Sequence, residues 1–273
     1  MPLTGLKIGF LGGGTIAGAL LTGLIKSGVH RANLYTSDIR QERLTYLQKN
    51  LGINPVEDNC RLVETVNVVI LAVKPQNVGL VLTGAGKFFR SGQTLISIAA
   101  GVPIKYIEEF LKEPVGVVRV MTNTPCLVSA GASAFCTGAY AGEVDIRRAK
   151  AVFSAVGKVT EVNEELMDAV TGLSGSGPAF MFVILEALSD AGVRLGLSRE
   201  AALFLGAQTM FGAAKMVLES GDHPAKLKDM VTTPAGTTIE GIFALEEGGL
   251  RHTLMKAVGE ATRRSSALSA GLK

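Results

Sequence analysis

The chain has 273 residues, of which 47% are hydrophobic and 19% charged, and its formal net charge at pH 7 is +3. These values exclude a disordered chain and allow one large domain or two ordinary ones. The small net charge, the 5% of aromatic residues and the lack of Trp argue against a nucleic-acid partner. Three scattered cysteines and three isolated histidines predict reduced thiols, with no disulfide framework and no metal site.

The N-terminus continues directly into an apolar segment, and no secretory signal is visible there. The longest apolar run, residues 178–185, stops at Glu186. It is shorter than the roughly 20 residues that a membrane-spanning helix needs. We therefore expect a cytoplasmic protein without a membrane partner.

The first part of the chain alternates short apolar runs with helical segments. Strands are predicted at residues 6–11, 32–36, 53–56, 66–73, 94–99 and 115–121. The run at 66–73 is almost wholly apolar and β-branched, as in a central parallel strand. Helices are predicted between the strands, the first two at residues 15–27 and 41–50. This alternation predicts an α/β Rossmann domain over residues 1–163, with a doubly wound, mostly parallel sheet.

The remaining residues, 164–273, are predicted to form an all-α domain. Its helices are expected at residues 178–191, 198–220, 224–230, 238–247 and 250–268. Ser198 is a suitable N-cap for the second of these helices, and Gly221 a suitable stop. The helix from Pro178 is apolar nearly all round, so it must be buried on every side. Because so few helices make a thin bundle, a partner subunit is expected to cover it.

A glycine-rich turn follows the first predicted strand. Gly12-Gly13-Gly14-Thr15-Ile16-Ala17 fits the pattern G-x-G-x-x-A between a strand and a helix. The first glycine allows the turn, the second lets a pyrophosphate approach the backbone, and the alanine lets helix and strand pack closely. The motif in this position predicts dinucleotide binding.

Polar residues at the end of the second predicted strand are candidates for the ribose end of the cofactor. Asp38 lies about twenty residues beyond Ala17, where an acid takes the ribose hydroxyls of NAD. Arg40 stands where it can meet a 2′-phosphate instead, and Ser37 suits either cofactor. These residues leave NADH and NADPH both open.

Small and polar residues also follow the central strands. Ala72-Val73-Lys74-Pro75 ends one strand and Ala99-Ala100-Gly101 the next. Ligands lie at the carboxyl ends of parallel strands, and small residues there let a nicotinamide pass close to the backbone. Lys74 at a buried edge needs an anion or an acceptor. Asn123, which follows a further strand, offers a polar group for a ligand or forms a turn.

Two polar loops lie in the helical part. Gly172-Leu173-Ser174-Gly175-Ser176-Gly177 precedes the apolar helix, and two serines between glycines allow close approach of a small ligand. Thr232-Thr233-Pro234-Ala235-Gly236-Thr237-Thr238 places amides and hydroxyls at a helix start, as a carboxylate site or as a simple cap. No nucleophile or strong general acid accompanies them. Hydride transfer needs mainly orientation and a dry pocket, so this absence favours a cofactor-dependent reduction.

Together these segments resemble the pyrroline-5-carboxylate reductase family, from Ile8 to about Leu268. The resemblance is most specific at residues 229–246 and 172–178. It implies reduction of the cyclic imine of 1-pyrroline-5-carboxylate to L-proline by NADH or NADPH, in proline biosynthesis. It also implies homodimers that form through the helical domain and share their active sites, often assembled into decamers.

The resemblance further implies roles for individual residues. Toward the cofactor, it implies that the glycine turn holds the pyrophosphate, that Val73, Lys74 and Ala100 border the nicotinamide, and that Asn59 lies near the adenosine. Toward the substrate, it implies that the amides of Thr237 and Thr238 bind the carboxylate. The residues that it places around them are Ser176, Thr233, Gly236 and, at the pocket edge, Glu164. The hydroxyl of Thr238 would reach the ring nitrogen and serve in catalysis.

Three positions depart from the family pattern: Thr122 replaces Pro, Ala235 replaces Gly, and Met230 replaces an Asn of some relatives. Ala235 is expected to avoid the backbone angles that glycine alone favours.

Two other functions are open to a chain of this kind. A β-hydroxyacid dehydrogenase would carry a catalytic lysine four residues after the second glycine motif, but the first lysine there is Lys215. A non-catalytic dinucleotide sensor would keep the fold without the chemistry. The intact threonine loop at residues 232–238 argues against a sensor.

Overall fold

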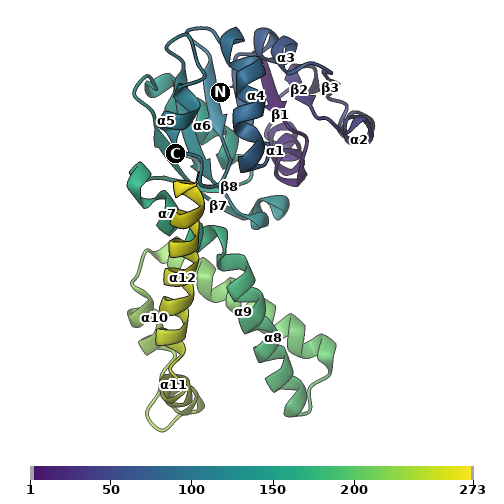
Figure 1. Cartoon of the computed structure of the whole chain (residues 1–273). Helices are drawn as coiled ribbons and strands as arrows, with labels where there is room; N and C mark the ends of the chain where they lie inside the picture. The colour runs from purple at the N-terminus through teal and green to yellow at the C-terminus, as the bar shows by residue number, and fades with distance from the viewer. Residues whose placement is uncertain (1–2, 272–273) are drawn as a thin grey trace. The chain divides into compact units, whose positions relative to one another are not determined.

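The computed structural model describes residues 3–271, and within them the N-terminal part of the chain forms a single sheet of eight strands (Figure 1). The strands are β1 (Ile8–Leu11), β2 (Leu34–Ser37), β3 (Asn54–Pro55), β4 (Val68–Leu71), β5 (Thr94–Ser97), β6 (Gly116–Met121), β7 (Gly131–Thr137) and β8 (Gly157–Glu161). Their order is β3-β2-β1-β4-β5-β6-β7-β8, and every pair is parallel except β6 with β7. The strands β2 and β3 lie on one side of β1, and β4 and the later strands lie on its other side. Open α/β sheets bind ligands at this switch in strand order, between β1 and β4.

Helices cover both faces of this sheet. They are α1 (Thr15–Lys26), α2 (Gln41–Leu51), α3 (Asn59–Thr65), α4 (Val78–Ala85), α5 (Ile104–Glu108) and α6 (Glu143–Ser154). Successive strand residues point to opposite faces. In β4, Val68 and Ile70 pack with α1 and α6, whereas Val69 and Leu71 pack with α3, α4 and α5. The sheet therefore lies between two hydrophobic cores, and the predicted Rossmann fold is confirmed.

The strands predicted from the sequence are all present, each somewhat shorter than expected. The strands β7 and β8 were missed. β7 has the sequence GASAFCT, whose small residues carry little strand preference, and β8 has the polar sequence GKVTE. Both lie at one edge of the sheet, where pairing to β6 and the packing of α6 decide their structure.

By its internal contacts the chain divides into two compact units, residues 1–176 with 259–273, and residues 177–258. The second unit holds α8 (Gly177–Arg194), α9 (Arg199–Ser220), α10 (Pro224–Met230), α11 (Thr237–Glu247) and the first half of α12 (Leu250–Ala270). Ser198 caps α9 by accepting a hydrogen bond from the Ala201 amide at 3.2 Å, and Gly221 ends it at φ 69°. Both predicted helix ends are confirmed. The predicted domain boundary after residue 163 stays a prediction.

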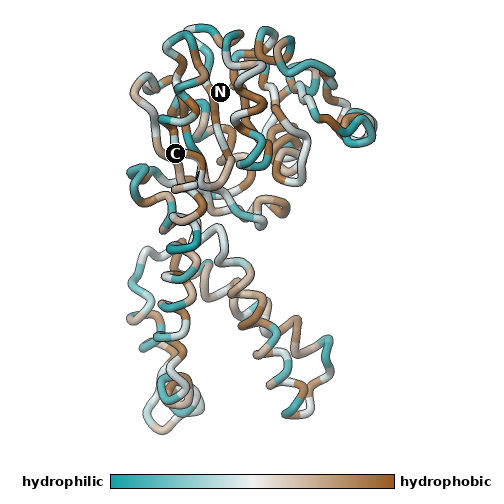
Figure 2. Tube along the Cα trace, viewed as in Figure 1, coloured by the Kyte–Doolittle hydropathy of each residue, from teal (hydrophilic) through white to brown (hydrophobic). Residues whose placement is uncertain are grey.

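Within one chain the apolar helix α8 is not covered. Its one buried residue is Ser189, and the side chains of Phe182 and Val183 are each 65% exposed. In α9 the one buried residue is Ala202. Figure 2 shows hydrophobic residues, in brown, along both helices. One chain alone therefore does not bury α8 on every side. This agrees with the prediction that a partner subunit covers the helix.

Two helical stretches, Glu164–Arg194 and Arg199–Ser220, are long and apolar enough by composition to cross a membrane. The first has 31 residues and contains the shorter apolar run 178–185 noted in the sequence. Large apolar helix faces are also typical of obligate subunit interfaces.

Candidate functional site

The glycine turn lies between β1 and α1, beside β4. Gly12 has φ 101°, and a Cβ atom at this position would lie 2.7 Å from the Ala72 carbonyl oxygen. Glycine is therefore required there. Gly14 precedes α1 without a side-chain cap, and a Cβ atom on it would meet nothing within 4 Å. The first amides of α1 thus have open space before them, which suits a pyrophosphate.

The predicted ribose residues are joined to this turn by hydrogen bonds. The Gly13 amide donates to Asp38 Oδ2 at 2.8 Å, and Arg40 Nε lies 3.1 Å from Asp38 Oδ1. Burial raises the pKa of Asp38, but the hydrogen bonds from Arg40 and Gly13 outweigh it and hold the pKa below its ordinary value. Ser37 Oγ donates to Asn59 Oδ1 at 2.6 Å. The structure thus brings all four predicted residues to the ends of β1 and β2.

Arg43, in the first turn of α2, was missed from the sequence. Its Nε donates to the Gly13 carbonyl at 2.5 Å, and its Nη2 donates to the Gly14 carbonyl at 3.3 Å. Its guanidinium lies 4.9 Å from the centre of the Tyr46 ring. An arginine on a polar helix carries no local pattern that identifies this contact.

The predicted nicotinamide residues follow β4 and β5. Ala72 and Val73 are half-buried, and Ala99 is buried. Lys74 is exposed, so the argument from a buried lysine was wrong. Its role toward a cofactor stays a prediction.

A cavity of about 550 Å³ opens beside these residues. Pro75, Ala100 and Gly101 form one part of its wall, and Thr171 and Ser176 another. Residues assigned to the cofactor and residues assigned to the substrate therefore line one cavity of the first unit. Gln76 and the end of α12 form the rest of the wall, and the sequence did not indicate the part played by α12.

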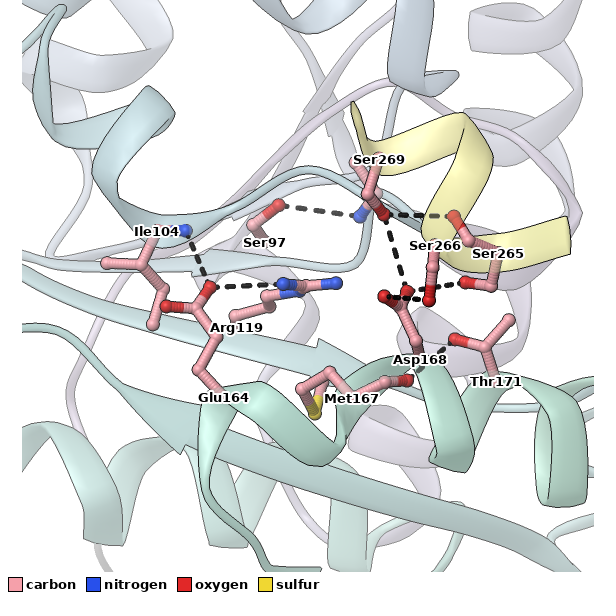
Figure 3. A network of polar contacts seen from close by, with 11 residues as sticks. Ser97, Ile104, Arg119, Glu164, Met167, Asp168, Thr171, Ser265, Ser266 and Ser269 are labelled. Atoms are coloured by element: carbon pink, nitrogen blue, oxygen red, sulfur yellow. Dashed lines mark hydrogen bonds and ion pairs between the residues drawn. The ribbon is translucent and has the colours of Figure 1, made fainter. Parts of the chain in front are cut away.

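Glu164 and Asn123 are both engaged in holding the fold. Glu164 Oε1 accepts from the Ile104 amide at 2.8 Å and from Arg119 Nη1 at 3.0 Å (Figure 3). The Asn123 amide group donates to the Ser174 carbonyl and accepts from the Ala132 amide. A ligand would have to share these groups.

The segment with Ser174 and Ser176 is itself helical. Residues Thr171–Gly175 form a π turn after α7 (Met167–Val170), and the Ser176 amide donates to the Thr171 carbonyl at 2.9 Å. Such π turns inside helical runs are frequent at functional sites.

The threonine loop of the second unit leaves a helix start open. Gly236 precedes α11 with φ −83°, and α11 has no side-chain cap. The amides at the start of α11, including those of Thr237 and Thr238, are therefore available to an anion. The sequence also allowed a loop whose side chains simply cap the helix, but no side chain caps α11 in the structure. A Cβ atom on Gly236 would lie 2.3 Å from Thr233 Oγ1, so these two residues are in close contact.

Ala235 adopts φ 55°, within the left-handed region that favours glycine. The expectation that this alanine avoids such angles was wrong. The loop keeps this left-handed conformation although the Cβ atom of alanine makes it less favourable. Thr122, the other departure near a ligand loop, is buried and accepts a hydrogen bond from Ser133 Oγ at 2.9 Å.

Comparison with known proteins gives the family. A family model described as pyrroline-5-carboxylate reductase dimerisation matches residues 164–268. A second model, described as NADP oxidoreductase coenzyme F420-dependent, matches residues 7–101. The pyrroline-5-carboxylate reductase of Methanosarcina acetivorans is 50% identical over 263 residues, covering 96% of this chain and 97% of that protein. The chain belongs to the pyrroline-5-carboxylate reductase family.

Other members of the family are similar over the same span. The pyrroline-5-carboxylate reductase of Arabidopsis thaliana is 41% identical and covers 98% of both chains. The solved structure of the Coxiella burnetii enzyme has a TM-score of 0.92 at 35% identity, covering 96% of this chain and 98% of that one. The Plasmodium falciparum pyrroline carboxylate reductase, solved with NADP bound, has a TM-score of 0.85 at 33% identity and covers 97% and 98%. The resemblance predicted from the sequence is confirmed, and the dimerisation domain makes the chain an oligomer.

Proposed function

We propose that this chain reduces 1-pyrroline-5-carboxylate to L-proline with NADPH or NADH, as a step of proline biosynthesis. The chain belongs to this family, and the observation that supports the proposal is that two of its helices begin without a side-chain cap. One is α1 behind the glycine turn, and the other is α11 behind the threonine loop. Each suits one anionic group of the two reactants, a pyrophosphate and a carboxylate.

The first unit binds and orients the cofactor. The turn of residues 12–17 takes the pyrophosphate, Ser37, Asp38, Arg40 and Asn59 take the adenosine ribose, and residues 72–75, 99–100 and Asn123 border the nicotinamide. The reduced nicotinamide supplies the hydride. Gly12 and Gly14 fit this role because one allows the turn and the other leaves open space before α1.

A second set of residues binds and orients the substrate. The amides of Thr237 and Thr238 hold its carboxylate, with Ser176, Thr233, Gly236 and Glu164 around it. The Thr238 hydroxyl hydrogen-bonds the ring nitrogen, which fixes the face of the C=N bond that receives the hydride. The hydride adds to the carbon of the protonated C=N bond, and the nitrogen keeps its proton as the amine of proline. Orientation of this kind accounts for most of what such a reaction requires.

The assembly that we propose is a homodimer through the helical domain, in which each active site draws on both subunits. Dimers of this kind are expected to assemble further into decamers, in the cytoplasm. The support is the exposed apolar side chains on the second unit's helices.

The first test is oxidation of NADH and of NADPH, in parallel, with 1-pyrroline-5-carboxylate as the acceptor. Turnover with either nucleotide is expected. The ratio of the two kcat/KM values measures the balance between Asp38, which suits a free ribose, and Arg40, which suits a 2′-phosphate. Nucleotide binding without turnover would instead favour the sensor.

The second test is Thr238→Ala, with Thr253→Ala as the matched control. Thr253 lies in the first turn of α12, where its hydroxyl bonds the Gly249 carbonyl. Loss of one hydrogen bond to a charged group, about 1.5–3 kcal/mol, should lower imine reduction roughly ten- to a hundred-fold. Cofactor affinity and folding should not change. Unaltered kinetics in Thr238→Ala would remove this residue from the mechanism.

A further inference from the structure

One helix face of α12 forms a wall of the cavity in the first unit. The residues of α12 that line the cavity are Ala261, Arg264, Ser265 and Leu268. Their spacing of three and four residues places them on one side of the helix. Arg264 is the single charged residue among all those that line this cavity.

A cluster of hydroxyls fixes the rotation of α12 at this place. Asp168, on α7, accepts hydrogen bonds from Ser265 Oγ at 2.6 Å, Ser266 Oγ at 2.9 Å and Ser269 Oγ at 3.3 Å. Figure 3 shows the three serines of α12 converging on this carboxylate. Gly101 lets the helix come close, since a Cβ atom on it would lie 3.1 Å from Ser269 Oγ. These contacts hold the face with Arg264 against the cavity.

Arg264 has no anionic partner in the part of the chain that the structure describes. Within residues 3–271 the side chain of Arg264 makes no hydrogen bond and no ion pair, whereas that of its neighbour Arg263 pairs with Glu260. Asp168, the nearby carboxylate of the hydroxyl cluster, is occupied by the serines. A guanidinium with five donors is thus available at a cavity whose other lining residues are uncharged.

We propose that Arg264 binds the carboxylate of the cyclic imino acid in this cavity and so selects substrates that carry a carboxylate. The inference rests on the proposed function and adds a residue to it. A guanidinium matches a carboxylate in shape and charge better than any other side chain does. A carboxylate offers about four lone-pair positions, so this contact does not exclude the α11 amides.

A phosphate of the cofactor is the other anion that a guanidinium would accept. The cavity wall at Pro75, Ala100 and Gly101 is the part assigned to the uncharged nicotinamide, and the pyrophosphate is assigned to α1. The carboxylate is therefore the source to which we commit. The Michaelis constants of the two reactants separate the two sources.

The test compares Arg264→Gln, Arg264→Lys and the control Arg263→Gln in the full-length oligomer. Each is assayed with 1-pyrroline-5-carboxylate and with 1-pyrroline, which has the same ring without the carboxylate. Arg264→Gln should raise the KM for 1-pyrroline-5-carboxylate about ten- to a hundred-fold. Its kcat/KM for 1-pyrroline and its KM for the nucleotide should stay as in the unsubstituted protein. Arg264→Lys should lie between, and Arg263→Gln should change neither value.

Several outcomes would overturn the inference. An unchanged KM for 1-pyrroline-5-carboxylate removes Arg264 from recognition, and an equal loss on both imines makes its role structural. A raised KM for the nucleotide assigns it to a cofactor phosphate. If Arg264→Gln does not fold, Arg264→Lys decides by whether its loss is confined to the carboxylate substrate. A native protein inactive on both imines overturns the proposed function, and this inference with it.

Discussion

The two units of the chain obtain a hydrophobic core in different ways. In the first unit, Phe10, Phe135 and Phe153 are fully buried among residues of the same chain. In the second unit, Phe182, Phe204 and Phe243 are 65%, 65% and 68% exposed. Phenylalanine is thus used in both units, but only the first has enough layers to bury it. The second unit must complete its core with another copy of the chain.

The largest expected effect comes from a charge placed on the uncovered face. Phe182→Asp would bury a carboxylate in the subunit interface, at a cost of several kcal/mol. The dissociation constant of the oligomer should rise by roughly a thousandfold. Sedimentation velocity should then show monomers, and imine reduction should be lost. The far-UV circular dichroism signal that comes from the first unit should remain.

Leu80→Asp is the matched control for this change. Leu80 lies on α4 of the first unit and is 78% exposed, as open to solvent as the apolar face of α8. Its substitution should leave the assembly and the activity unchanged. An intact oligomer with Phe182→Asp, or dissociation with Leu80→Asp, would contradict the difference between the units.

The next effect tests the self-contained core. Phe10 lies in β1 with no exposed surface, so Phe10→Ala should lower the free energy of unfolding by about 3–5 kcal/mol. Since this core lies within one chain, the loss should be the same at every protein concentration. Thermal unfolding at two concentrations a hundredfold apart measures this. A loss that grows on dilution would mean that the first unit also depends on the partner.

The sequence was sufficient wherever a local pattern and the final structure agree. The run that became β4 is apolar on both faces because helices cover both, and Gly12 is a glycine because its angle and the Ala72 carbonyl allow nothing else. The threonine loop was found because its hydroxyls and glycine are adjacent in the chain. These features need no knowledge of distant residues.

The sequence was insufficient wherever distant segments meet. Arg43 reaches the glycine turn across thirty residues, and Asp168 meets the serines of α12 across about a hundred. Neither contact has a spacing rule, because tertiary packing alone brings the partners together. Ala235 is the local failure, since its residue type argues against the angle that the loop imposes.

A smaller effect concerns the hydroxyl cluster, where α12 joins the first unit. Asp168→Ala removes the acceptor of three serine hydroxyls and should lower the free energy of unfolding by about 1–3 kcal/mol. Asp190→Ala, which removes an exposed ion pair with Arg199 in the second unit, should cost about 0–1 kcal/mol. Denaturant unfolding measures both. Equal losses would mean that the three hydrogen bonds to Asp168 stabilise the fold no more than an exposed ion pair does.

The smallest expected effect depends on pH and belongs to the first unit. Hydrogen bonds from Arg40 and Gly13 hold the pKa of Asp38 below its ordinary value of 3.8, despite the opposing effect of burial. Because the folded state favours the ionised carboxylate, Asp38 stabilises the protein above about pH 4 and loses this contribution as the pH falls through the folded pKa. The melting temperature of Asp38→Asn should therefore lie below that of the native protein near pH 7, and the difference should shrink below pH 4. A difference that stays constant, or grows in acid, would show that the carboxylate acts through its shape and not through its charge.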